Sequence, residues 1–200
     1  MLLPLLLLSL SASPTDRPSF AARQPWPIVA TAGGRAMGFD PLPASPHGAL
    51  GTELHLVARR SFALALAADA GFFSQPSFAR GGSLDATLLP RYTAPFGLTA
   101  DLGLVVGGQV SRTPGPTYRV TPGEGLQPAR APALPAARFG LAASLGYDFG
   151  ATTRIPLRVF IRYRQLLQTP FMPGNDVPMM GIADLGGGVA FALGTWRRQR

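Results

Sequence analysis

Apolar and polar residues alternate along most of this chain after residue 25. Leu50, Leu54 and Leu56 share one phase of the alternation, whereas Glu53 and His55 share the other. An alternation with period two is typical of a β-strand that has one apolar face. We therefore predict strands over residues 28–37, 49–59, 62–73, 83–92, 96–110, 137–149, 154–168 and 181–196.

Four acidic residues stand sixteen positions apart, each on the less apolar face of its segment. A strand of about 9–11 residues followed by a turn gives such a repeat in a transmembrane barrel. Arginines of later segments share that face and would meet the carboxylates across a closed barrel. We predict a buried charge network in the lumen made of Glu53, Asp69, Asp85, Asp101, Asp148, Arg158, Arg162, Arg164, Asp184 and Arg35. The alternative is that some of these charges lie in water at the rims.

The connections between the predicted strands alternate in length. Those at residues 60–61, 93–95 and 150–153 are short, and the others are longer, above all a Pro-, Gly- and Arg-rich loop at about 111–136. Outer-membrane barrels have short periplasmic turns, longer external loops and an even number of strands. The predicted fold is all-β: an eight-stranded antiparallel up-and-down transmembrane β-barrel.

Composition narrows the alternatives. The 24 glycines and 21 prolines favour short strands and turns over long helices. After the first ten residues, no run of about 18 uncharged apolar residues occurs, which excludes a bundle of membrane helices. A soluble lipocalin-like barrel would also alternate, but its apolar face lines a cavity and its polar face meets water. Here the second face is mostly Gly, Ala and Ser with single charges, which suits a narrow filled lumen.

The N-terminal segment and the net charge of the chain indicate its cellular location and the class of its partners. The leucine-rich segment 1–10 and the small residues after it predict a secretory signal over residues 1–22, with a barrel domain over 26–198. The formal net charge of +8 favours phosphate-bearing partners. Nucleic acid is not expected, because the arginines are scattered and form no binding motif. With no cysteine and two histidines, no metal site or cofactor is expected.

The last predicted strand contains the sequence Gly-Val-Ala-Phe-Ala-Leu at residues 188–193. It is similar to the closing-strand signal of outer-membrane barrels, with Leu193 in the place of the final aromatic residue. By this segment and its overall pattern, the chain resembles the OmpA/OmpX-like group of small barrels from Gram-negative bacteria. The resemblance implies location in the cell outer membrane and insertion by the barrel-assembly machinery.

The favoured role is non-catalytic: a structural or surface-interaction protein in contact with outer-membrane lipids, including lipopolysaccharide. The candidates for binding lipid phosphate are Arg112, Arg119 and Arg130 of the long loop. The alternative is a solvated, disordered loop without a ligand. The external partner of the protein is not specified by any motif.

Two other functions remain as alternatives. A lipid A-modifying enzyme would need a histidine with a serine and an acid. Only His47, beside Ser45 in the first external loop, and His55, near Glu53, are available. His55 fits better as a lumen-packing residue and His47 as a loop residue. A small gated pore is the other alternative, although eight strands leave no open aqueous channel.

Overall fold

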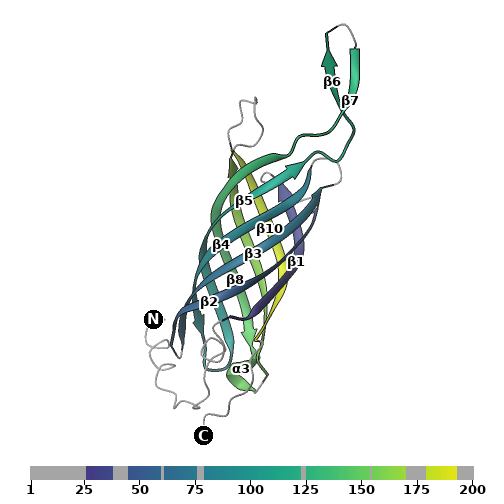
Figure 1. The fold of residues 1–200 in the computed structure, drawn as a ribbon. Helices are drawn as coiled ribbons and strands as arrows, with labels where there is room; N and C mark the ends of the chain where they lie inside the picture. The colour runs from purple at the N-terminus through teal and green to yellow at the C-terminus, as the bar shows by residue number, and fades with distance from the viewer. Residues whose placement is uncertain are drawn as a thin grey trace, which may run out of the picture.

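The computed structural model describes residues 26–37, 45–59, 61–75, 79–122, 125–153, 155–169 and 179–192. Eight long antiparallel strands close into a barrel in the order β1-β10-β9-β8-β5-β4-β3-β2 (Figure 1). Their bounds are β1 Ile28–Met37, β2 Ser45–Ala58, β3 Phe62–Gln75, β4 Ala79–Thr93, β5 Leu98–Arg112, β8 Leu134–Asp148, β9 Leu157–Thr169 and β10 Met180–Phe191. The predicted fold class is confirmed.

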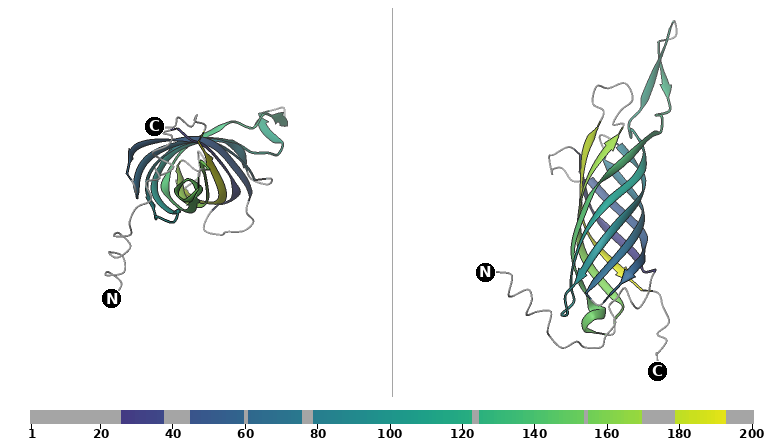
Figure 2. Two further views of the ribbon diagram at one scale, coloured as in Figure 1. Left: turned by 90° about the horizontal axis from the view of Figure 1, so that it is seen from below. Right: turned by 90° about the vertical axis from the view of Figure 1, so that its left-hand side faces the viewer.

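Two small elements mark the ends of the barrel. The hairpin of β6 (Thr117–Thr121) and β7 (Gly125–Ala129) projects beyond one end, which we call the hairpin end. The short helix α3 (Phe149–Thr152) lies at the other, the helix end. Figure 2 shows the strands inclined to the barrel axis, with the hairpin and α3 at opposite ends. Among the described residues, no helix has the length and apolar character needed to cross a bilayer.

The two faces of the barrel wall differ as the alternation predicts. Outward-facing Leu84, Leu102 and Leu145 are 70%, 63% and 65% exposed. Inward-facing Ala65 and Ala67 are completely buried beside the charged residues of the lumen. Small side chains are required there, because an eight-stranded barrel is only wide enough for side chains to fill it. The apolar residues therefore cover the outside of the barrel instead of lining a cavity.

The strands extend further toward the hairpin end than the sequence predicts. β2 begins at Ser45 instead of residue 49, and β4 begins at Ala79 instead of residue 83. Only residues 76–78 separate β3 from β4, so the prediction of a longer connection at residues 74–82 is wrong. The added segments are rich in Gly and Ser, which carry little strand signal, and the ladder with the neighbouring strand holds them.

The segment expected as a long loop at 111–136 contains two further strands. β5 continues to Arg112, β8 begins at Leu134, and between them the two-stranded β6–β7 sheet forms. Tyr118 pairs with Pro128, and Val120 with Leu126, so one face of this ribbon is apolar. The described part of this segment therefore contains a hairpin where no strand was predicted.

Three local features at the helix end also differ from the predictions. The turn before β5 extends to Gly97, whose φ of +98° a residue with a side chain rarely adopts, so β5 starts after it. Phe149 begins α3 instead of ending a strand. The β2–β3 register shifts between His55 and Val57, and Val57 is 43% exposed on the outer side instead of facing the lumen with Glu53.

Candidate functional site

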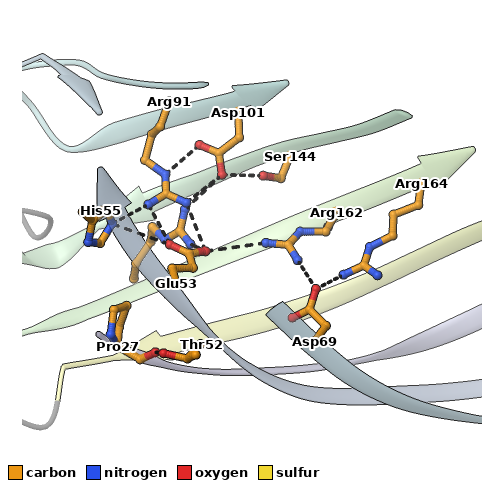
Figure 3. A network of polar contacts seen from close by, with 11 residues as sticks. Pro27, Thr52, Glu53, His55, Asp69, Arg91, Asp101, Ser144, Arg162 and Arg164 are labelled. Carbon is orange, nitrogen blue, oxygen red and sulfur yellow. Dashed lines mark hydrogen bonds and ion pairs between the residues drawn. The ribbon is translucent and has the colours of Figure 1, made fainter. Parts of the chain in front are cut away.

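The lumen near the helix end holds a closed ring of two carboxylates and two guanidinium groups. Glu53 accepts hydrogen bonds from Arg91 at 2.9 and 3.1 Å and from Arg158 at 2.7 Å. Asp101 accepts from the same two arginines, at 2.8 and 3.1 Å from Arg91 and 3.0 Å from Arg158. Ser144 donates a further bond to Asp101 at 2.8 Å (Figure 3). The ring is electrically neutral and each group in it has at least two partners.

A second cluster connects β3, β4, β8 and β9. Asp69 accepts a hydrogen bond from Arg164 at 2.6 Å, and Asp85 accepts one from the same guanidinium at 3.2 Å. Arg138 donates to Asp85 through Nε at 2.6 Å and through Nη2. Arg138 also donates to Gln109 at 3.3 Å. These bonds join strands that are far apart in the sequence across the lumen.

The pair of Arg35 and Asp184 lies where the barrel closes. The two residues are direct partners in the β1–β10 register, and Arg35 donates to both carboxylate oxygens at 2.7 and 2.9 Å. Such a two-bond fork is a strong form of ion pair. The Arg35 guanidinium also lies 4.4 Å from the centre of the Phe73 ring. This pair therefore reinforces the seam between the first and last strands.

Arg162 lies between the ring and the second cluster (Figure 3). Its Nη2 is 3.7 Å from Glu53 Oε1, and its Nη1 is 3.6 Å from Asp69 Oδ2. These separations permit charge attraction, but they exceed a normal hydrogen bond. The guanidinium carbon is also 4.8 Å from the centre of the Phe160 ring.

The structure buries all the predicted lumen residues inside the barrel, and Asp148 is the direct register partner of Arg158. Asp148 is buried at the helix end, where its carboxylate accepts from the Gly150 backbone N–H at 2.7 Å and caps α3. The sequence analysis missed Arg91 and Arg138, although both contact predicted carboxylates. The signal was present: Arg91 has the same strand phase as Asp85, and Arg138 the same phase as the inward residues of its strand.

Buried salt bridges thus fill the barrel. Each buried ion costs several kcal/mol to remove from water, and only close partners offset that cost. The paired groups and the small residues between them occupy the interior that an aqueous channel would need. This packing is opposite to that of a soluble binding barrel with an apolar cavity.

Neither histidine has the geometry of a catalytic triad. His47 does not lie in an external loop as expected: it belongs to β2, faces the lumen, is 8% exposed, and its Nε2 has no hydrogen-bond partner. His55 Nε2 lies 3.5 Å from Arg91 Nη1 and 3.8 Å from Glu53 Oε2. A nucleophile activated by histidine requires a hydrogen bond between the two groups. No such serine–histidine bond occurs among the described residues.

The three arginines proposed for lipid contact are exposed at the hairpin end. Arg119 lies within the hairpin, and Arg130 follows it. Arg112 lies at the end of β5, directly opposite Arg80 of β4 in the strand register, and both side chains occupy the outward phase. The sequence analysis missed Arg80, because it placed the start of that strand at residue 83.

No protein-family model matches the chain, and no curated protein matches it in sequence. Among solved structures, Neisserial surface protein A is similar with a TM-score of 0.57 and 12% identity, over 83% of this chain and 96% of that one. The N-terminal β-barrel domain of Pseudomonas aeruginosa OprF has a TM-score of 0.43 and 16% identity, over 82% of this chain and 97% of that one. Ail, the attachment invasion locus protein of Yersinia pestis, has a TM-score of 0.45 and 10% identity, over 83% of this chain and 97% of that one. The chain has the fold of the small eight-stranded outer-membrane β-barrels.

Proposed function

We propose that this protein is an integral, non-catalytic component of the outer membrane whose barrel anchors surface arginines that bind lipid phosphate. The apolar outer wall supports the first part of the proposal. Leu84, Leu102, Leu104 and Leu145 are each more than 60% exposed in the isolated barrel. Burial of apolar surface contributes roughly 25 cal/mol per Å², so a lipid environment stabilises this wall and water does not.

The pair of Arg80 and Arg112 carries the second part of the proposal. Like charges directly opposite on neighbouring strands repel each other, unless an anion lies between them. Both residues are exposed, and nearby outward positions toward the helix end include Val110 and Leu84. The arginine pair therefore stands at the edge of the apolar wall, at the level where lipid headgroups lie. Guanidinium groups bind phosphate through paired hydrogen bonds.

The ligand that fits best is a lipid with phosphate on its headgroup, such as the lipid A part of lipopolysaccharide. Arg119 and Arg130 are further candidates for contact with phosphate above the barrel rim. In this proposal the barrel-assembly machinery inserts the protein, and the ion-paired lumen makes it a rigid anchor instead of a pore. A catalytic role is disfavoured by the engagement of the lumen carboxylates by arginine and by the surroundings of the histidines.

The proposal predicts that lipid A binding depends on the arginine pair. Purified protein in a neutral detergent is titrated with diphosphoryl lipid A, and with lipid A from which the phosphates have been removed. The double variant Arg80→Gln/Arg112→Gln is expected to bind the phosphorylated form at least about tenfold more weakly, because it loses charge-assisted hydrogen bonds that contribute roughly 1.5–3 kcal/mol each.

The matched control is Arg119→Gln/Arg130→Gln, which removes the same charge from exposed positions outside the barrel wall. It is expected to weaken binding less than the wall pair does. Equal binding of diphosphoryl lipid A by the wild type and by Arg80→Gln/Arg112→Gln would contradict the proposal, as would equal binding of the two lipid A forms by the wild type.

A further inference from the structure

A small cavity lies inside the barrel between β1, β2, β9 and β10. Its volume is about 20 Å³, and its lining includes Thr31, His47, Arg162, Arg164 and Asp184. A guest the size of one water molecule needs roughly 10–15 Å³, so the cavity accepts a single small species. A phosphate group with its four oxygens is too large for it.

The lining carries an unusual concentration of unpartnered polar atoms. Arg162 is 4% exposed, and its Nε, Nη1 and Nη2 all lack hydrogen-bond partners. Thr31 Oγ1 and His47 Nε2, which line the same cavity, are also buried without a partner. Buried polar groups are nearly always satisfied, and a charged one left without hydrogen bonds is especially unfavourable. These residues therefore indicate a hydrogen-bond acceptor beside Arg162.

The hydrogen bonds of the other lumen arginines show what Arg162 lacks. Six arginines are buried in the described part of the lumen. Five of them donate hydrogen bonds to carboxylates, and Arg162 does not. The five acceptors are Glu53, Asp69, Asp85, Asp101 and Asp184. Asp148, the remaining lumen carboxylate, caps α3 at the helix end. With Asp148 included, the described lumen holds six arginines and six carboxylates, so Arg162 lacks a hydrogen-bonded acceptor and not a countercharge. Its nearest carboxylate oxygens, on Asp69 and Glu53, are 3.6 and 3.7 Å away.

Asp184 does not supply the missing acceptor. It lines the cavity, but both of its carboxylate oxygens accept hydrogen bonds from Arg35. Arg164 adds positive charge from the same strand, although its own bonds go to Asp69 and Asp85. A water molecule would satisfy a donor of Arg162, but an anion interacts more strongly with a guanidinium in a medium of low dielectric constant.

We propose that this cavity binds one monatomic anion, a halide, held by the Arg162 guanidinium. The Thr31 hydroxyl donates to the anion as well, and His47 does so in the tautomer that carries its proton on Nε2. The anion supplies the hydrogen-bond acceptor that the Arg162 guanidinium lacks between the two ion-paired clusters. It thereby acts as a structural ligand of the folded barrel, independently of any lipid bound on the outside.

The direct test is crystallographic. Crystals of the wild-type protein grown in sodium bromide are measured at the bromine absorption edge. The proposal predicts an anomalous peak in the cavity, within hydrogen-bonding distance of Arg162. Density without anomalous signal, which identifies a water molecule, or no density at all, would overturn it. This arm requires no variant and does not depend on the proposed lipid binding.

A solution measurement tests the role of Arg162. The unfolding midpoint of the detergent-solubilised protein is compared in sodium chloride and in sodium gluconate at equal ionic strength. A ligand that binds only the folded state raises stability with its concentration, so the wild type is expected to unfold at a higher midpoint in chloride. Arg162→Gln should lose this difference, and Arg59→Gln, which changes an exposed arginine with no role in either proposed site, should keep it. Equal midpoints of the wild type in the two salts, or a chloride effect retained in Arg162→Gln, would contradict the proposal.

Discussion

Replacing Arg91 with methionine is expected to destabilise the barrel by about 3–5 kcal/mol, because it leaves buried carboxylates without a partner. Arg91 is 3% exposed and donates four hydrogen bonds, two to Glu53 and two to Asp101. In the variant, Arg158 alone remains to offset both charges within the ring. The measurement is the free energy of unfolding in urea, in detergent or lipid vesicles.

Two comparisons show whether the effect comes from the ring. Arg119→Met removes the same side chain from the exposed hairpin and is expected to change stability by less than about 0.5 kcal/mol. The double variant Arg91→Met/Glu53→Gln removes one charge of each sign, and it should be less destabilised than the sum of the two single variants. A cost for Arg91→Met no greater than that for Arg119→Met would show that the ring does not hold the lumen together.

Introducing an arginine on the outer wall should have a comparably large effect. Leu104 lies near the middle of β5, faces outward and is 62% exposed. In a bilayer, arginine at the midplane of a barrel destabilises it by roughly 2–4 kcal/mol. We expect Leu104→Arg to cost that amount when unfolding is measured in lipid vesicles.

The matched control lies on the hairpin, outside the barrel. Val120 is 73% exposed there, and Val120→Arg is expected to leave stability within about 0.5 kcal/mol of the wild type. If Leu104→Arg were as harmless as Val120→Arg, the outer wall would be in contact with water, and the membrane assignment would be wrong.

The alternation of residue types was enough to predict the barrel and the direction of most side chains. Glu53, Asp69, Asp85 and Asp101 all face the lumen, because the two-residue period of a strand is insensitive to small errors in its ends. The same rule, applied to every residue of each segment, would also have found Arg91. The sequence therefore contains the signal that places Arg91 in the lumen.

Other features depend on tertiary contacts that the pattern does not contain. The irregularity near Val57 reverses the direction of that residue, and only the pairing with β3 reveals it. The opposition of Arg80 and Arg112 requires the exact register of β4 and β5. Asp148 follows the lumen phase, but the helix that begins after it gives its carboxylate a capping role. The signal segment predicted over residues 1–22 lies outside the described residues, as does Leu193.

The ion-paired lumen and the apolar wall stabilise the barrel in different ways. Arginine–carboxylate pairs tie strands across the interior, including the β1–β10 seam, while the wall gains stability only from an apolar surrounding. The hairpin and the Arg80–Arg112 pair lie at the same end of the barrel. We propose that lipid phosphate binds at this end of the barrel.

The most direct measurement is the environment of a spin label on the outer wall. The chain contains no cysteine, so Leu145→Cys and Val120→Cys each supply a single labelling site. In lipid vesicles, the label at residue 145 should collide readily with oxygen and hardly with a water-soluble nickel complex, whereas the label at residue 120 should show the reverse. A label at residue 145 that is fully accessible to the nickel complex would contradict the claim that the wall faces lipid.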